Sequence, residues 1–280
     1  VRTVQWEGRD NYSPSTLLWG GDDVMVEQIQ KFIEEKRDEG KIINSIIRDD
    51  VFSILEKECT VLYYYLDDAI EGFHISKPVR GEQKQFVFIN TQKVLQEQVW
   101  TAGHELGHVW KVDQYVKNNC ANCSEDIETI IGKFTAELLM PKENFRAEIQ
   151  SKLTEYQYKG TVMSQEMMIE LVTYLMNFFA VPEKAIIRRF SELGYIKREH
   201  IEVYLDSFRA GTDYYKKIIT EKQYTRLDKT REVYSMGNIH EDILQLEKKE
   251  LVKSKYVKHV REMFHIDDNP NLQEQLQFEG

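Results

Sequence analysis

The stretch of sequence that decides the fold reads Thr101-Ala102-Gly103-His104-Glu105-Leu106-Gly107-His108-Val109-Trp110. It lies in an apolar-periodic segment, residues 94–111, for which we predict one long helix. Residues four apart on a helix lie one turn apart along the axis and about 40° apart around it, so both imidazoles point to one spot. Glu105 lies at their flank. Neutral imidazoles are ligands of Zn²⁺, and a carboxylate beside them that does not bind the metal can take a proton from water.

The pattern therefore predicts a metal centre with His104 and His108 as ligands and Glu105 as general base. The competing interpretation is that the two histidines only pack or hydrogen-bond on an amphipathic helix. The flanking residues favour the metal, because Gly107 leaves room beside it and the approach to the motif is apolar, with Val99, Trp100 and Ala102.

A catalytic zinc held by three protein ligands needs one more, and we expect it on the next predicted helix, residues 124–140. Glu128 borders the apolar stripe of that helix one turn before Ile131, so it can point inward. Glu125 lies one turn earlier on the same edge and is the second candidate. Glu137 falls about half a revolution from Glu128, and we expect it to face solvent.

Cys120 and Cys123 lie in the loop between the two predicted helices. A Cys-x-x-Cys without a second pair does not make a separate zinc site, which would need two further ligands. Its place between the ligands suggests a regulatory pair. In this hypothesis a thiolate occupies the open coordination position of the metal, and disulfide formation withdraws the thiolate from that position. The alternative is two reduced thiols in a loop.

The rest of the chain is predominantly helical in pattern. Segments 61–66, 72–75 and 86–89 are predicted as two or three antiparallel strands that form the only sheet, with substrate added as a strand along 86–89. Helices are predicted from Asp22 to Gly40 and over 42–58, 164–180 and 182–193, and beyond 197 the chain is charged and helical. This is an α+β fold, with an N-terminal arm and helix over 1–40, a metal-binding domain over 41–200 and a helical extension over 201–280.

Composition limits the function classes. The 280 residues carry a net charge of -10, with 41% apolar residues and three cysteines. An odd number of cysteines in a chain of this length is no disulfide framework, and no apolar run reaches the length of a bilayer span, so we expect a cytoplasmic protein without membrane contact. The acidic balance disfavours direct nucleic-acid binding, which needs clustered lysines and arginines.

Three stretches together resemble the ImmA/IrrE family of metallopeptidases: the motif at 101–110, the segment from Ile127 to Pro141 that closes on Leu-Leu-Met-Pro, and the segment from Leu175 to Gly194. As in that family, Ile89-Asn90 ends a strand before the metal helix. The resemblance covers about residues 50 to 196. It implies a zincin-like fold in which His104, His108 and Glu128 hold zinc and Glu105 is the general base.

The resemblance further implies that the chain cleaves a helix-turn-helix repressor and so relieves repression in a stress, phage or mobile-element context. Two positions depart from the family pattern. Ile131-Gly132 replaces the usual Ala-Asn, and Val112 replaces a frequent histidine, which affects the surroundings of the metal and leaves the ligands intact. The alternative function is a metal-containing binding module that controls a repressor or toxin by docking. A module of that kind has no need of Glu105.

Overall fold

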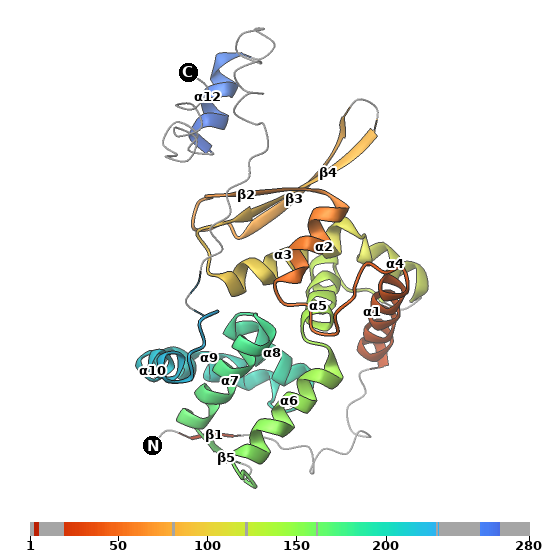
Figure 1. The fold of residues 1–280 in the computed structure, drawn as a ribbon. Helices are drawn as coiled ribbons and strands as arrows, with labels where there is room; N and C mark the ends of the chain where they lie inside the picture. The colour runs from red at the N-terminus through yellow and green to blue at the C-terminus, as the bar shows by residue number, and fades with distance from the viewer. Residues whose placement is uncertain are drawn as a thin grey trace. The chain divides into compact units, whose positions relative to one another are not determined.

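The computed structural model describes residues 3–5, 20–79, 82–120, 123–160, 162–227, 229 and 253–263. The chain divides into two compact units, which are considered separately. The first comprises Val1–Glu58 and Val94–Lys229, and the second comprises Cys59–Lys93 and Thr230–Gly280. Figure 1 shows helices predominating in the first unit and a small sheet in the second, so the predicted α+β class is confirmed.

The first unit contains most of the helices. In chain order its elements are β1 (Thr3–Gln5), α1 (Gly20–Asp38), α2 (Asp50–Glu58), α3 (Leu95–Val109), α4 (Val112–Asn119), α5 (Ile127–Leu139), α6 (Lys142–Glu155), β5 (Val162–Ser164), α7 (Gln165–Phe179), α8 (Glu183–Glu192), the short 3-10 helix η2 (Arg198–His200), α9 (Ile201–Ala210) and α10 (Thr212–Lys222). Strands β1 and β5 pair antiparallel, so the sheet of the second unit is not the only one. Residues 6–19 of the expected N-terminal arm lie outside the described residues.

The helix boundaries follow the sequence signals closely in three places. Ser164 caps α7 by accepting a hydrogen bond from the Met167 backbone N–H, and Pro182 stands directly before α8. Gly194, with φ of +78°, ends the turn that follows α8.

Two of the predicted helices are shorter than expected. Residues 42–49 are not helical, because Arg48 adopts φ of 51° and α2 begins only at Asp50. The guanidinium of Arg48 donates instead to the carbonyl of Phe178 near the end of α7. The long helix predicted over 94–111 ends at Val109, since Lys111 has φ of 55°, and α4 starts beyond it in a new direction.

The second unit is a three-stranded mixed sheet in the order β2 (Thr60–Tyr64), β4 (Glu82–Asn90) and β3 (Gly72–Val79), together with α12 (Ser254–Met263). The prediction of an antiparallel sheet is wrong for one of its pairs, because β2 and β4 run parallel. The prediction that substrate adds along 86–89 is wrong as well. Residues 86–89 of strand β4 are paired on both sides, with Phe86 opposite both Thr60 and Ile75, so this segment has no free edge.

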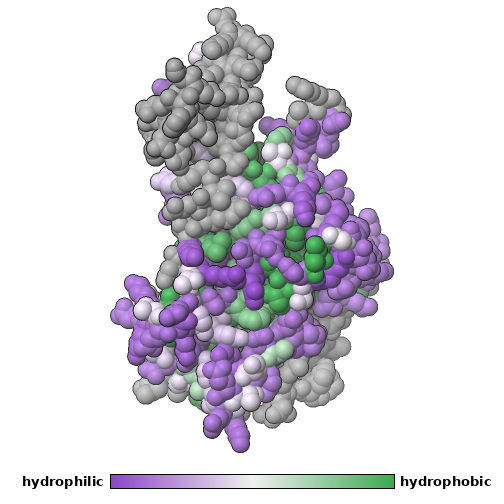
Figure 2. Space-filling model, viewed as in Figure 1, coloured by the Kyte–Doolittle hydropathy of each residue, from purple (hydrophilic) through white to green (hydrophobic). Residues whose placement is uncertain are grey.

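Apolar side chains form the interior of each unit. In the second unit, Phe73 stacks on Phe88 at 4.5 Å between ring centroids, and Val257 of α12 joins the buried cluster. The visible face is largely hydrophilic, with apolar residues gathered near its middle (Figure 2). None of the helices among the described residues combines the length and the apolar character that crossing a bilayer requires.

Candidate metal centre

Helix α3 presents its two histidines on one side, one turn apart. The ring centroids of His104 and His108 are 5.0 Å apart, and their Nε2 atoms are 3.3 Å apart. Each side chain is largely buried but still reaches solvent, with exposed fractions of 24% and 21%. The predicted convergence of the two imidazoles is therefore present.

Helix α5 can approach α3 closely because α3 has glycines at the contact. A Cβ atom on Gly107 would lie 2.9 Å from Phe134 Cδ1 and 3.0 Å from Ile131 Cγ2. A Cβ atom on Gly103 would lie 3.1 Å from Leu139 Cδ1 and 3.2 Å from Thr135 Cγ2. The glycine pair, four residues apart, thus allows the first turns of α5 to come within side-chain reach of the histidines.

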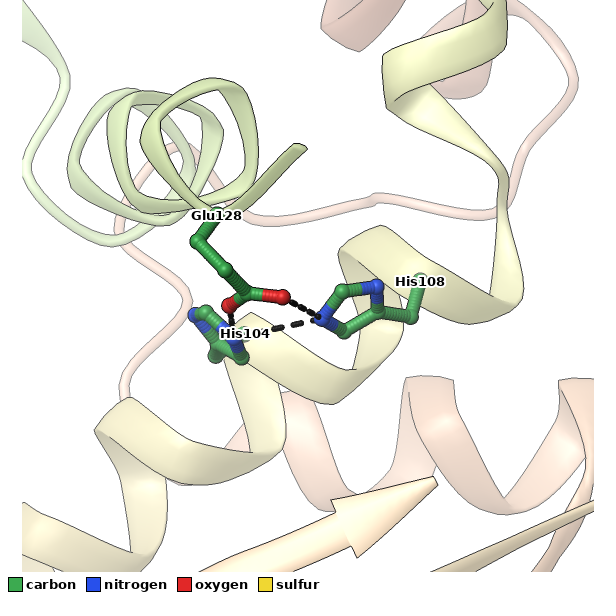
Figure 3. Close-up of side chains that lie close together, drawn as sticks. All are labelled: His104, His108 and Glu128. Atoms are coloured by element: carbon green, nitrogen blue, oxygen red, sulfur yellow. Dashed lines mark hydrogen bonds and ion pairs between the residues drawn. The ribbon is translucent and has the colours of Figure 1, made fainter. Parts of the chain in front are cut away.

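The first turn of α5 carries Glu128 to the histidines. Asp126 caps this helix, since its carboxylate accepts from the Thr129 backbone N–H at 2.9 Å. Figure 3 shows the Glu128 side chain extending from α5 so that its carboxylate faces both rings. Glu128 Oε2 lies 3.0 Å from His104 Nε2, and Oε1 lies 3.5 Å from His108 Nε2. The ligand atoms of the three residues all lie within 4.8 Å of one another.

These spacings are close to those between ligand atoms on one zinc ion. With Zn–N and Zn–O bonds of roughly 2.0 to 2.2 Å and a tetrahedral angle, neighbouring ligand atoms are about 3.4 Å apart. The two imidazole nitrogens are 3.3 Å apart, and the two Glu128 oxygens each lie near one of them, Oε2 at 3.0 Å from His104 and Oε1 at 3.5 Å from His108. Two imidazole nitrogens and one carboxylate oxygen are also the donor set of many catalytic zinc sites with an open fourth position. The residues present therefore fit such a cation.

The electrostatics of His108 favour the form that binds a metal. Burial lowers the pKa of His108, and the neighbouring His104 lowers it further, while Glu128 and Asp113 act in the opposite direction. The lowered pKa favours the neutral imidazole, whose nitrogen lone pair is the ligand.

Glu105 has a different environment from Glu128. It is only 6% exposed, and its Oε2 atom is buried without a hydrogen-bond partner among the described residues. Burial, with a smaller contribution from the negative charge of Glu128, raises the pKa of Glu105 to about 7. A carboxyl group with a pKa near neutrality can both accept and release a proton under physiological conditions.

Two of the acidic residues considered from the sequence lie elsewhere. Glu125, the second candidate for the third ligand, is half-buried and is not part of the cluster that the structure brings together. The prediction that Glu137 faces solvent is wrong. Its side chain is 5% exposed and lies 2.6 Å from the guanidinium of Arg189, which is 4% exposed. The sequence pattern of α5 alone could not reveal this partner on α8.

The cysteines do not lie in the cluster either. Cys120 and Cys123 are joined by a disulfide, and neither belongs to the group of ligand atoms around Glu128. The structure therefore places the pair in its oxidised form, at the start of the connection to α5. Cys59 is half-buried and takes no part in a disulfide.

Sequence reasoning overlooked two residues that shape the centre. Gly103 repeats the small side chain of Gly107 one turn earlier, and the four-residue spacing was the available signal. Asp126 precedes the helix by one residue, and the Asp-x-x-Thr pattern was the signal for a cap.

A helix with this motif, joined by a carboxylate from the following helix, defines a metallopeptidase-type domain. Residues 64–191 match the peptidase M78 family model, described as the IrrE N-terminal-like domain. The matched segment contains His104, Glu105, His108 and Glu128. The match to this family, ImmA/IrrE, covers 128 of the 280 residues, so the resemblance indicated by the sequence is confirmed for a domain at 64–191. No curated protein matches the chain.

Proposed function

We propose that this chain is a zinc-dependent endopeptidase. The observation that carries the proposal is the convergence of His104, His108 and Glu128 beside a buried carboxylate that has no hydrogen-bond partner among the described residues. A buried polar atom without a partner is rare in folded proteins and calls for an explanation. A role as the general base, which accepts a proton from water, is such an explanation, and the match to a peptidase family agrees with it.

The division of work among the residues follows from their chemistry. His104, His108 and Glu128 would hold Zn²⁺, which would polarise the scissile carbonyl and acidify a water molecule. Glu105 would accept the proton of that water at a carboxylate oxygen and deliver it to the leaving amine. Its pKa of about 7 matches both transfers. The donor set of two imidazoles and one carboxylate supports zinc over a hard cation such as Mg²⁺, which prefers oxygen ligands.

For the substrate, we propose a helix-turn-helix transcriptional repressor whose cleavage relieves repression in a stress, phage or mobile-element context. This part of the proposal rests on the family resemblance.

Ligand assignment is tested by metal content. We expect the zinc-loaded wild-type protein to carry one zinc per chain, Glu128→Gln to lose it, and Glu125→Gln to retain it. Glu125 is the matched control because it is an acidic residue one turn away, outside the cluster. Retention by Glu128→Gln together with loss by Glu125→Gln would transfer the third ligand to Glu125.

Proteolysis is tested by incubating a candidate repressor with wild-type protein and with Glu105→Gln. We expect cleavage by the wild type, and binding with cleavage reduced about 10²- to 10⁴-fold by the variant, which is the usual contribution of general acid–base catalysis. Binding by both proteins with the repressor left intact would contradict the peptidase and favour the docking module.

A further inference from the structure

Helix α3 carries a second buried polar side chain without a hydrogen-bond partner among the described residues, one turn before Glu105. Thr101 is 5% exposed, and its hydroxyl oxygen is buried without a partner in the described part of the chain. Thr101 is on the same helix as His104 and His108 but is not part of the cluster of ligand atoms.

The other threonines show that this is unusual. Thr135 on α5 and Thr173 on α7 are both fully buried, and their hydroxyls donate to the carbonyls of Ile131 and Ile169, four residues earlier. The remaining threonines of the described helices also donate, namely Thr129, Thr154, Thr212 and Thr220. Back-bonding to the preceding turn is the ordinary solution for a helical threonine. Thr101 alone among these threonines leaves its hydroxyl available.

A complementary polar group, the Glu105 carboxylate, lies on the same side of α3. Residues four apart on a helix are neighbours, with Cβ atoms about 5 to 6 Å apart, so Glu105 is the next polar side chain along this face. Glu105 Oε2 is a buried acceptor without a donor, and Thr101 Oγ1 is a buried donor without an acceptor. A buried polar group without a hydrogen bond costs free energy, and a donor and an acceptor of this kind one turn apart can both be satisfied by one bridging water.

We propose that Thr101 is a positioning residue for Glu105. Its hydroxyl donates to the Glu105 carboxylate through a bridging water and holds it in the orientation in which it receives a proton. The inference rests on the proposed function, because Glu105 has a proton to receive only in a hydrolase. The assignment names no further metal ligand and leaves the three-residue cluster unchanged.

The first test is a double-mutant cycle that needs neither metal nor substrate. It uses the free energies of unfolding in urea of the metal-free wild type, Thr101→Val, Glu105→Ala and the double variant. We expect the effect of Thr101→Val on the unfolding equilibrium constant to change at least about fivefold when Glu105 is replaced. Thr173→Val is the matched control, since its hydroxyl has a backbone acceptor, and its effect should be the same with either residue at 105. Additivity of Thr101→Val and Glu105→Ala would overturn the inference.

The second test measures turnover. In Thr101→Val we expect kcat to fall about tenfold, with KM and zinc per chain unchanged, because a displaced base slows the chemical step and leaves binding intact. Thr101→Ser restores the hydroxyl and should recover most of kcat, while Thr173→Val should retain it. Full kcat in Thr101→Val, or loss of zinc along with activity, would overturn the inference. Absence of cleavage by the wild type would refute the proposed function, and the cycle would still decide whether Thr101 serves Glu105.

Discussion

Two glutamates on neighbouring helices of the same unit are buried to nearly the same extent, yet their surroundings are opposite. Glu105 on α3 is 6% exposed and has no hydrogen-bond donor among the described residues, whereas Glu137 on α5 is 5% exposed and bonded to Arg189. Gln30 also donates to Glu137, and the Met140 carbonyl accepts from Arg189. Burial is therefore no guide to role, and the partner distinguishes them. Glu137 bonds to residues of two other helices, whereas Glu105 Oε2 has no hydrogen-bond partner among the described residues.

The comparison is most sharply tested by removing the charge of Glu137. Glu137→Gln leaves the Arg189 guanidinium buried without its main carboxylate, which costs about 3 to 5 kcal/mol of stability. Urea denaturation would measure the loss. Glu192→Gln is the control, because Glu192 also bonds Arg189 but is more exposed, and its effect should be much smaller. Replacing Glu137 and Arg189 together by Leu and Met should recover most of the stability, as no buried charge then remains.

In the metal-free protein, Glu105 should make the free energy of unfolding depend on pH. Its pKa is about 7 in the folded chain against 4.5 ordinarily, so between these values the folded chain binds more protons than the unfolded chain. Stability contributed by this group is therefore present below pH 4.5 and lost as pH rises through 7, by roughly 3 kcal/mol at most.

Urea titrations at several pH values between 5 and 8 check this expectation. The Glu105→Gln variant should lack that part of the slope, and the difference between the two proteins isolates Glu105 from the other titrating groups. Parallel curves for wild type and variant would show that Glu105 is solvated or partnered like Glu137.

Substitutions of the α3 glycines that face α5 test whether packing at one end of this helix pair affects zinc binding independently of packing at the other end. Gly107→Ala places a Cβ atom 2.9 Å from Phe134, which should cost about 1 to 3 kcal/mol by overpacking. Because Ile131 follows Glu128 by about one turn and Phe134 follows it by nearly two, we also expect zinc affinity to fall about tenfold, as for changes around a ligand. Metal titration and urea denaturation would measure both.

Two matched variants sharpen this prediction. Gly132→Ala adds a methyl group on α5 where no atom lies within 4 Å, so it should stabilise the helix by about 0.5 to 1 kcal/mol and leave zinc binding unchanged. Gly103→Ala places a Cβ atom against Leu139 and Thr135, near Glu137. It should lower the free energy of unfolding and leave zinc affinity almost unchanged. Equal effects of Gly103→Ala and Gly107→Ala on zinc would contradict independent ends.

The smallest effect is expected at the cap of α5. Asp126→Ala removes the acceptor of the Thr129 N–H and loosens the turn that carries Glu128, so zinc affinity should fall modestly and stability by about 1 kcal/mol. Calorimetric zinc titration would detect it. Ser164→Ala removes the corresponding cap of α7 and should leave zinc binding unaffected.

Local sequence signals predicted the elements that carry the centre. The spacing of His104 and His108 placed both on one side of a helix, and the apolar stripe of the next helix singled out Glu128 over Glu125 and Glu137. The structure brings His104, His108 and Glu128 together. Predictions that depended on distant segments were less successful. Helical periodicity in 42–49 was overridden by the contact of Arg48 with Phe178, and the order of strands placed β4 in the centre of its sheet.

The cysteine pair shows the same limit. Its place between the ligands in sequence suggested that a thiolate could occupy the metal's open position, but the structure pairs the two sulfurs with each other. Occupation of the open metal position by a thiolate therefore remains a prediction about the reduced form. Proximity along the chain was a poor guide to proximity in space, because α4 leads the chain away before the loop returns to α5.

By itself, the sequence determined the helix that bears the motif, the family, and the residues able to bind a metal, since helical geometry fixes which neighbours share a face. Only the tertiary structure decided which buried carboxylate has a cationic partner and which has none, because Arg189 lies 52 residues from Glu137 in the chain. It also decided that glycine-lined packing brings Glu128 to the histidines. Hydrogen-bond partners and interatomic distances between separate helices depend on how these helices pack, and local periodicity contains no information on that.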